Sequence, residues 1–145
     1  MKKLLISAFI ASSLIGCTSV PMGDAKQDAA LKVFKVPVDR SGIYIYRTGS
    51  LLGAMVKMDV MIDGTLIGQT ASNTYLYKEV TPGKHTIVSK AENTDSIDIE
   101  AKPGTLNYVR QEVQMGIVYS RNKLHLVDEV TGKKGITETK LAETK

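Results

Sequence analysis

The two histidines, His85 and His125, have the widest choice of chemistry of any side chains in this sequence. An imidazole titrates near neutral pH, so it can act as a general acid or base, or it can bind a metal ion. A zinc site needs three or four ligands. Neither histidine stands in an HxH or HExxH spacing, and neither has a carboxylate at ligand spacing. We therefore interpret both as strand residues, and we expect His85 to hydrogen-bond near its turn.

The carboxylates form no acid–base pair that the sequence can show. Asp59 and Asp63 stand four positions apart on one predicted strand, which is too far for joint catalysis because a strand rises about 3.3 Å per residue. The sequence contains no GxSxG, no P-loop and no GxGxxG. It therefore predicts no catalytic residue, no metal ligand and no cofactor.

The single cysteine, Cys17, follows a segment with the features of an export signal. Lys2 and Lys3 precede an apolar run over residues 4–15, which is too short to span a bilayer because a spanning helix needs about 20 residues. The run Leu14-Ile15-Gly16-Cys17 resembles the lipobox of bacterial lipoproteins. This resemblance implies removal of residues 1–16 and lipid attachment to Cys17. The alternatives are an ordinary secretory signal with a chance cysteine, or a short membrane anchor.

The lipoprotein resemblance also bears on location and on function. Thr18, rather than Asp, follows the cysteine, which implies the outer membrane in a Gram-negative bacterium with the enteric type of sorting. An acylated Cys17 leaves no thiol for a disulfide, a thiolate nucleophile or a metal. We expect a periplasm-facing envelope lipoprotein that acts as a non-catalytic binding or structural module. The alternative is an envelope enzyme such as a cell-wall hydrolase, whose site would be assembled from residues distant in sequence.

Charge gives little information about partners. The chain has 19 Lys and Arg against 15 Asp and Glu, and removing Lys2 and Lys3 leaves 17 against 15, a net charge of +2. This balance offers no electrostatic footprint for nucleic acid. The expected partners are the membrane, through the lipid on Cys17, and an envelope protein or cell-wall component. Arg47 and Arg110 are interpreted either as ligands for an anionic group or as members of ordinary surface ion pairs.

A period of two in the apolar residues predicts a mainly β chain. In the strand 42–47, Ile43 and Ile45 face one way and Tyr44 and Tyr46 the other, which is typical of a central strand. Asp63-Gly64 predicts a type I′ hairpin turn. We expect an antiparallel β-sandwich of about seven strands, with strands at 55–63, 65–68, 73–80, 84–90, 96–100 and 106–115 and a last hairpin from 117–119 and 124–127.

The predicted domain organisation has four parts: a signal peptide at 1–16, a lipidated tether at 17–35, a β-sandwich at 36–129 and a polar tail at 130–145. The tether contains a short helix that begins after Asp24, and it would reach roughly 60 Å if fully extended. The tail is expected to hold one weak helix that starts near Asp128 and to end in a frayed segment, because Gly132 and Gly135 are poor helix formers.

Two groups of apolar side chains are candidate partner-binding residues. Tyr44 and Tyr46, with Tyr75 and Tyr77, form either an aromatic platform or cross-strand packing pairs. Leu51 and Leu52 stand in a loop that is apolar where a connection is normally polar. They form either a docking patch or a cap over the open end of the sandwich.

Several of these segments together resemble a known family. They include the runs Ile43 to Arg47, Val60 to Gly64, Glu79 to His85 and Asn107 to Arg110. The match is to a family of bacterial lipoproteins known only as a domain of unknown function, and it covers about residues 29–127. The Asp-Gly hairpin followed by a Pro-Gly-x-His turn also resembles the small sandwich repeats named PEGA domains, more loosely. The resemblance implies a fold and brings no activity with it.

Overall fold

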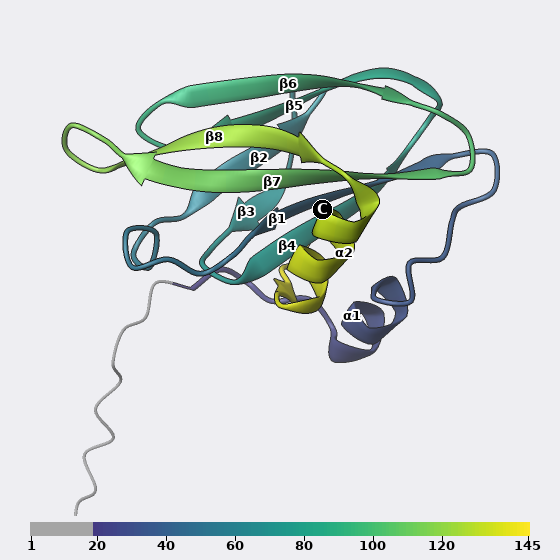
Figure 1. The fold of residues 1–145 in the computed structure, drawn as a ribbon, viewed down its shortest axis with the longest axis horizontal. Helices are drawn as coiled ribbons and strands as arrows, with labels where there is room; N and C mark the ends of the chain where they lie inside the picture. Colours follow the sequence, from purple (N-terminus) through teal and green to yellow (C-terminus); the bar gives the residue numbers. More distant parts are fainter. Residues whose placement is uncertain (1–18) are drawn as a thin grey trace, which may run out of the picture.

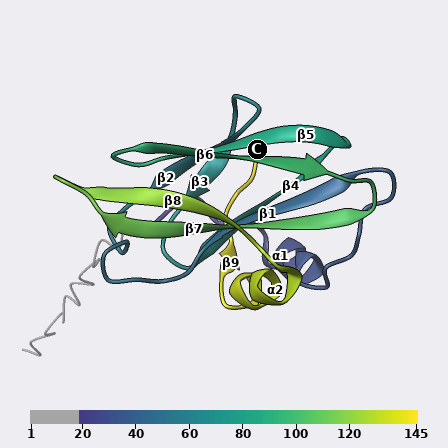
Figure 2. The ribbon, with the colours of Figure 1, turned by 45° about the horizontal axis from the view of Figure 1, so that its top comes forward.

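The structure, a computed structural model, describes residues 19–145. The predicted signal peptide at 1–16 and the predicted lipidation site Cys17 lie outside the described residues. Residues 19–145 form nine strands and two helices. The strands make two sheets that pack face to face, and both helices lie beneath one of them (Figures 1 and 2). The prediction of a mainly β sandwich with two short helices is confirmed.

The first sheet has five strands in the order β8-β7-β1-β4-β9. Its central strand β1 is buried along its whole length because it has neighbours on both sides and a packed layer on both faces. The bounds are β1 Ser41–Arg47, β4 Thr74–Val80, β7 Thr105–Met115, β8 Ser120–Val127 and β9 Lys140–Leu141.

The second sheet has four strands in the order β3-β2-β5-β6, all antiparallel. The bounds are β2 Met58–Ile62, β3 Thr65–Thr70, β5 Gly83–Lys90 and β6 Thr94–Ala101. Asp63 and Gly64, between β2 and β3, have φ values of 51° and 79°, as the predicted type I′ turn requires. The sandwich core lies between the sheets and includes Ile43 and Ile45 from β1.

The first sheet is mixed, which differs from the predicted antiparallel arrangement. β1 pairs with β7 in parallel, with Ser41 opposite Thr105, and β4 pairs with β9 in parallel. The chain makes β5 and β6 in the opposite sheet before it returns, so β7 starts at the same end as β1. Sequence periodicity does not carry this information, because it is the same for both strand directions.

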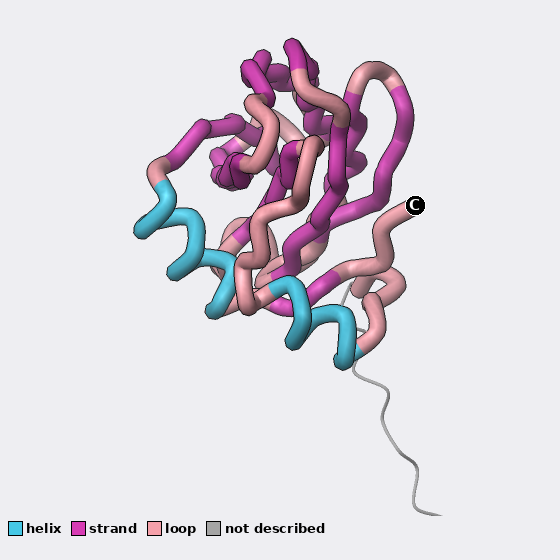
Figure 3. The backbone as a smooth tube through the Cα atoms, turned by 90° about the vertical axis from the view of Figure 1, so that its right-hand side faces the viewer, coloured by secondary structure: helices cyan, strands magenta, loops and turns pink. Residues whose placement is uncertain are grey.

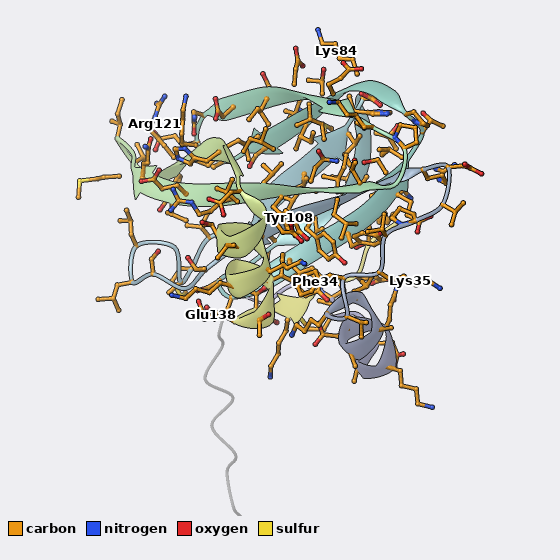
Figure 4. All side chains as sticks on the ribbon, turned by 45° about the vertical axis from the view of Figure 1, so that its right-hand side comes forward. Phe34, Lys35, Lys84, Tyr108, Arg121 and Glu138 are labelled. Atoms are coloured by element: carbon orange, nitrogen blue, oxygen red, sulfur yellow. The ribbon has the colours of Figure 1, made fainter. Side chains whose placement is uncertain are left out.

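A second apolar core lies on the outer face of the first sheet. Tyr44, Tyr46, Tyr75 and Tyr108 pack there beneath α1 Ala25–Leu31 and α2 Glu129–Thr137. Figure 3 shows both helices on the same side of the strands, and Figure 4 shows Phe34 and Tyr108 in the layer between the helices and the sheet. The helices begin after Asp24 and Asp128, whose carboxylates accept backbone N–H bonds from Gln27 and Thr131.

The ends of the described chain are packed on the domain rather than free. The predicted tether folds back, because Val20 is 5% exposed within the sandwich core and α1 covers the sheet. The predicted polar tail holds α2 and β9, and Leu141 and Ala142 are buried. Met22 bridges to Ala142 in an antiparallel manner. The two ends of the described part of the chain therefore pair with each other.

The last predicted hairpin is wrong at its first strand. Residues 117–119 form a loop, and β7 extends to Met115 before it. The side chains of this loop point into solvent, with Ile117 89% exposed. Apolar residue types suggested a strand here, but the turn between β7 and β8 occupies the segment.

Candidate functional site

One end of the sandwich carries two long loops. Residues 48–57 join β1 to β2, and residues 116–119 join β7 to β8. Both lie at the left-hand end in Figure 1. The hydroxyl of Ser120 donates to the carbonyl oxygen of Leu52 at 3.0 Å, and Gly53 lies against the side chain of Val113. The two loops are therefore parts of one surface.

This surface is made of large apolar side chains that face solvent. Leu51 is fully exposed, and Leu52 remains partly accessible at 43%. Apolar exposure of this kind is unusual on the surface of a monomeric soluble domain. We name it the apolar end and define it as Leu51, Leu52, Met55, Met115, Ile117, Val118 and Tyr119.

A buried arginine shapes the first loop. Arg47 is 1% exposed, and its Nη2 donates to the carbonyl oxygens of Val56 at 2.6 Å and Gly53 at 3.2 Å. Its burial lowers the pKa of the guanidinium to about 10. No carboxylate pairs with Arg47 among residues 19–145. Its contacts are backbone carbonyls, so Arg47 sets the path of residues 48–57.

A carboxylate holds the second loop. Glu92, between β5 and β6, accepts hydrogen bonds from the backbone N–H groups of Ile117 at 3.1 Å and Tyr119 at 3.0 Å. Desolvation acts to raise the pKa of Glu92, but these backbone hydrogen bonds outweigh it and the pKa is lowered. The tip of the β7–β8 hairpin is thus fixed by its backbone, and its side chains point outward.

A polar layer separates the apolar end from the sandwich core. Gln111 of β7 is buried, accepts from the Thr70 hydroxyl at 2.6 Å and donates to Ser89 Oγ at 2.7 Å. Asn122 of β8 is also buried and donates to the carbonyl oxygen of Asn93 at 3.2 Å. Because these groups bind one another, the exposed loop residues are not an extension of the core.

Charges beside the loops are balanced. A hollow next to the two loops is lined by Lys57, Lys90, Asp59 and Glu92, together with Met55 and Tyr119. The two cations and two carboxylates give this hollow no net formal charge.

The predicted site residues lie in two different environments, one exposed and one buried. Leu51 and Leu52 lie on the apolar end, and Leu51 does not fold back as a cap. Tyr44 and Tyr46 are each 1% exposed beneath the helices, so they pack in the second core and form no aromatic platform. The ring of Tyr44 stacks on that of Tyr108 with centroids 5.5 Å apart. The interpretation of these tyrosines as packing residues is the correct one.

The interpretation of Arg47 as a member of a surface ion pair is wrong, because Arg47 is buried and donates to backbone carbonyls. Sequence reasoning also missed most of the apolar end, namely Met55, Met115, Ile117, Val118 and Tyr119. The available signal is the apolar run around Gly116, whose residue types also predict a strand.

The histidines are engaged in local pairs. His85 Nδ1 lies 2.5 Å from Asp63 Oδ2, and its Nε2 lies 2.6 Å from the Thr81 carbonyl oxygen. His125 Nε2 lies 2.6 Å from Glu112 Oε2 across β7 and β8. Residues 19–145 contain no cluster of three or more His, Cys, Asp or Glu side chains arranged to hold a metal ion.

None of the helices in the described part of the chain is long and apolar enough to cross a membrane.

Comparison with known proteins identifies a family. Residues 37–123 match the family model described as "Protein of unknown function (DUF2846)". A protein of Haemophilus influenzae, described as "Uncharacterized protein", is 33% identical over 135 residues, which cover 92% of this chain and 80% of the relative. The chain therefore belongs to the DUF2846 family. The expectation of a family of unknown function is confirmed.

Proposed function

We propose that this member of the DUF2846 family is a lipid-anchored, non-catalytic module of the bacterial cell envelope. It is attached to the outer membrane through Cys17, faces the periplasm, and makes its contacts through the apolar end. The observation that carries the proposal is the run Leu14-Ile15-Gly16-Cys17 at the end of a cationic and apolar segment.

The histidine geometry supports the non-catalytic part of the proposal. Below the raised pKa of His85, both ring nitrogens carry protons and donate them to the Asp63 carboxylate and the Thr81 carbonyl oxygen. A doubly protonated imidazole that is held on both sides has no free nitrogen to act as a base. His125 is partly exposed on β8, and its Nε2 is engaged with the carboxylate of Glu112.

The anchor is tested by intact mass spectrometry of the protein purified from detergent-solubilised membranes. We expect a chain that starts at Cys17 and carries a diacylglyceryl group on sulfur and an acyl group on the amine. A Cys17→Ser variant serves as the control and should stay uncleaved or become soluble. An unmodified Cys17, or a first residue elsewhere in the chain, would contradict the proposal.

The non-catalytic role is tested in a strain that lacks the gene. The membrane-anchored double variant His85→Ala with His125→Ala should complement any deletion phenotype. Thermal unfolding of the purified variant reports whether the fold is kept. Loss of complementation with the fold intact would instead favour an enzyme with a histidine-dependent site.

A further inference from the structure

The first described residues are fixed to the domain. Val20 is 5% exposed and packs in the sandwich core. The backbone N–H of Gly23 donates to Leu141 O at 2.9 Å, and the N–H of Glu143 donates to Pro21 O at 2.8 Å. The chain therefore has a defined position from Val20 onward.

That position is at the loop-bearing end of the sandwich. Val20 shares the core with Ala71 in the β3–β4 turn, and Asn73 of the same turn lies against Gly49 of the first loop. Figures 1 and 2 show the described chain starting beside the loop of residues 48–57. The path toward Cys17 thus leaves the domain close to the apolar end.

The sequence leaves very little chain between the lipid and the fold. Cys17 precedes Val20 by three residues, so the two are separated by at most about 10 Å at roughly 3.5 Å per residue. One headgroup layer of a bilayer is about 5–8 Å thick. If Cys17 carries lipid, Val20 must lie within or just above the headgroups.

We infer that the apolar end contacts the bilayer that holds the lipid on Cys17, with its loop tips inserted at headgroup depth. This inference rests on the proposed function, because it requires the anchor. The short link brings the apolar end to the membrane. The exposed Leu, Met, Ile and Val side chains supply apolar area, and Tyr119 is of a type enriched at membrane interfaces.

The backbone of the β7–β8 tip is suited to the headgroup region of a bilayer. Polar groups that leave water need partners, and Glu92 already accepts the N–H groups of Ile117 and Tyr119. Lys57 and Lys90 are balanced by Asp59 and Glu92, and Arg121 beside Glu92 adds one exposed cation, so the attraction to anionic lipid is weak. We therefore expect contact that depends on apolar insertion and only weakly on salt.

The test uses the full, lipidated protein reconstituted into vesicles of phosphatidylethanolamine and phosphatidylglycerol. The sulfur of Cys17 carries lipid, so an introduced cysteine is the single free thiol. Val118→Cys and Leu51→Cys place an environment-sensitive fluorophore at the apolar end. Lys84→Cys is the matched control, because Lys84 is exposed at the start of β5, whereas Glu92, which binds the β7–β8 tip, follows the other end of β5. Figure 4 shows Lys84 at the top of the view, away from Arg121.

The emission of the fluorophores attached at positions Val118 and Leu51 should shift to shorter wavelengths. Nitroxides on the upper acyl chains should quench them several-fold more strongly than the probe at Lys84. Equal quenching at all three positions would overturn the inference. Shielding that appears only when envelope proteins are added would also overturn it, in favour of a protein partner.

Intact mass of the same samples separates the two proposals. A mass without lipid, or labelling of Cys17 itself, means that the proposed anchor has failed. A correctly lipidated protein whose Val118 probe stays in water means that the anchor stands and the bilayer contact does not. The substituted side chains are exposed, and unfolding curves that match the parent confirm that each variant is folded.

Discussion

Gly132 of α2 lies directly against Cβ and Cγ of Tyr108 in β7. A β-carbon at this position would overlap the base of the tyrosine side chain, which no rotation of the ring can move away. Gly135, one turn later, lies against the ring of Tyr46 in the same way. The two glycines, which weaken the helix locally, let α2 approach the aromatic face of the sheet.

We expect Gly132→Ala to lower the free energy of unfolding by up to about 2 kcal/mol. Overpacking a filled site costs about 1–3 kcal/mol, and the gain in helix propensity offsets about 1 kcal/mol of this cost. Urea unfolding of the variant beside Lys134→Ala, an exposed position of the same helix, provides the measurement. A more stable Gly132→Ala variant would show that helix propensity dominates and that the helix can move off the sheet.

Stability should fall as the pH rises above about 6.5 because of His85. Burial acts to lower the pKa of His85, but hydrogen bonds to Asp63 and Thr81 outweigh it, so the folded pKa is raised above the ordinary 6.5. The contribution of the pair is fully present below pH 6.5 and is lost as the pH passes through the raised pKa.

Asp63 sets the acid limit of the same pair. The backbone N–H of Thr86 and then the ring of His85 lower the pKa of Asp63 below its ordinary 3.8. Its contribution is present above pH 3.8 and is lost as the pH falls through the lowered pKa. The pair is therefore strongest between about pH 4 and 6.5, the window that these two ordinary values set.

The variant His85→Gln tests this window. It should lower the free energy of unfolding by about 1 kcal/mol at pH 5.5. This value is low for a charged hydrogen bond, because half of the Asp63 side chain is exposed to solvent. It should also flatten the decline in stability between pH 6.5 and 9. His125→Gln is the matched control, and an equal change of slope in both variants would contradict the assignment.

Gly64→Val should destabilise the β2–β3 hairpin. Gly64 has φ +79°, and an added β-carbon would meet no atom within 4 Å, so the cost of about 1–2 kcal/mol comes from backbone strain alone. Gly64→Asn should cost much less, because Asn tolerates this region. Thermal unfolding measures both variants. Equal melting temperatures would show that backbone strain does not cause the loss of stability.

Arg47→Met should loosen the first loop more than it weakens the fold. The substitution keeps the buried apolar stem and removes a charge that burial disfavours, so the free energy of unfolding should change by less than about 1 kcal/mol. It also removes the two hydrogen bonds to Gly53 and Val56. Hydrogen exchange should quicken in residues 48–57 only. A large global loss of stability would mean that Arg47 supports the core.

Sequence patterns predicted much of the fold because they reflect local physics. Alternation placed Ile43 and Ile45 in the core, and the positive-φ turn at Asp63-Gly64 and the helix cap at Asp128 follow from single residue types. The parallel pairing of β1 with β7 and the docking of β9 depend on contacts distant in sequence, which no periodicity contains.

The candidate site was only partly predictable for a similar reason. Leu51 and Leu52 stood out because an apolar loop is unusual, whereas Ile117 and Val118 have the composition of a strand. Tyr44 and Tyr46 lie on the face of β1 away from the sandwich core, and their burial depends on α2, whose glycines gave no local sign of a packed helix. The closeness of Val20 to the apolar end required the structure.

The pairing of Ser41 with Thr105, 64 positions later, has a consequence for how the chain acquires its fold. The central strand gains its second neighbour only after residue 105 is available, and the second core closes only with Ile136 and Leu141. Chains dominated by such distant pairings have high contact order and fold on the millisecond-to-second scale. Until β7 and β9 are available, β1 and β4 each present an unpaired backbone edge. An unpaired strand edge is a template for pairing with another chain, so the incomplete domain is exposed to aggregation until its last forty or so residues are synthesised, at roughly 5–20 residues per second.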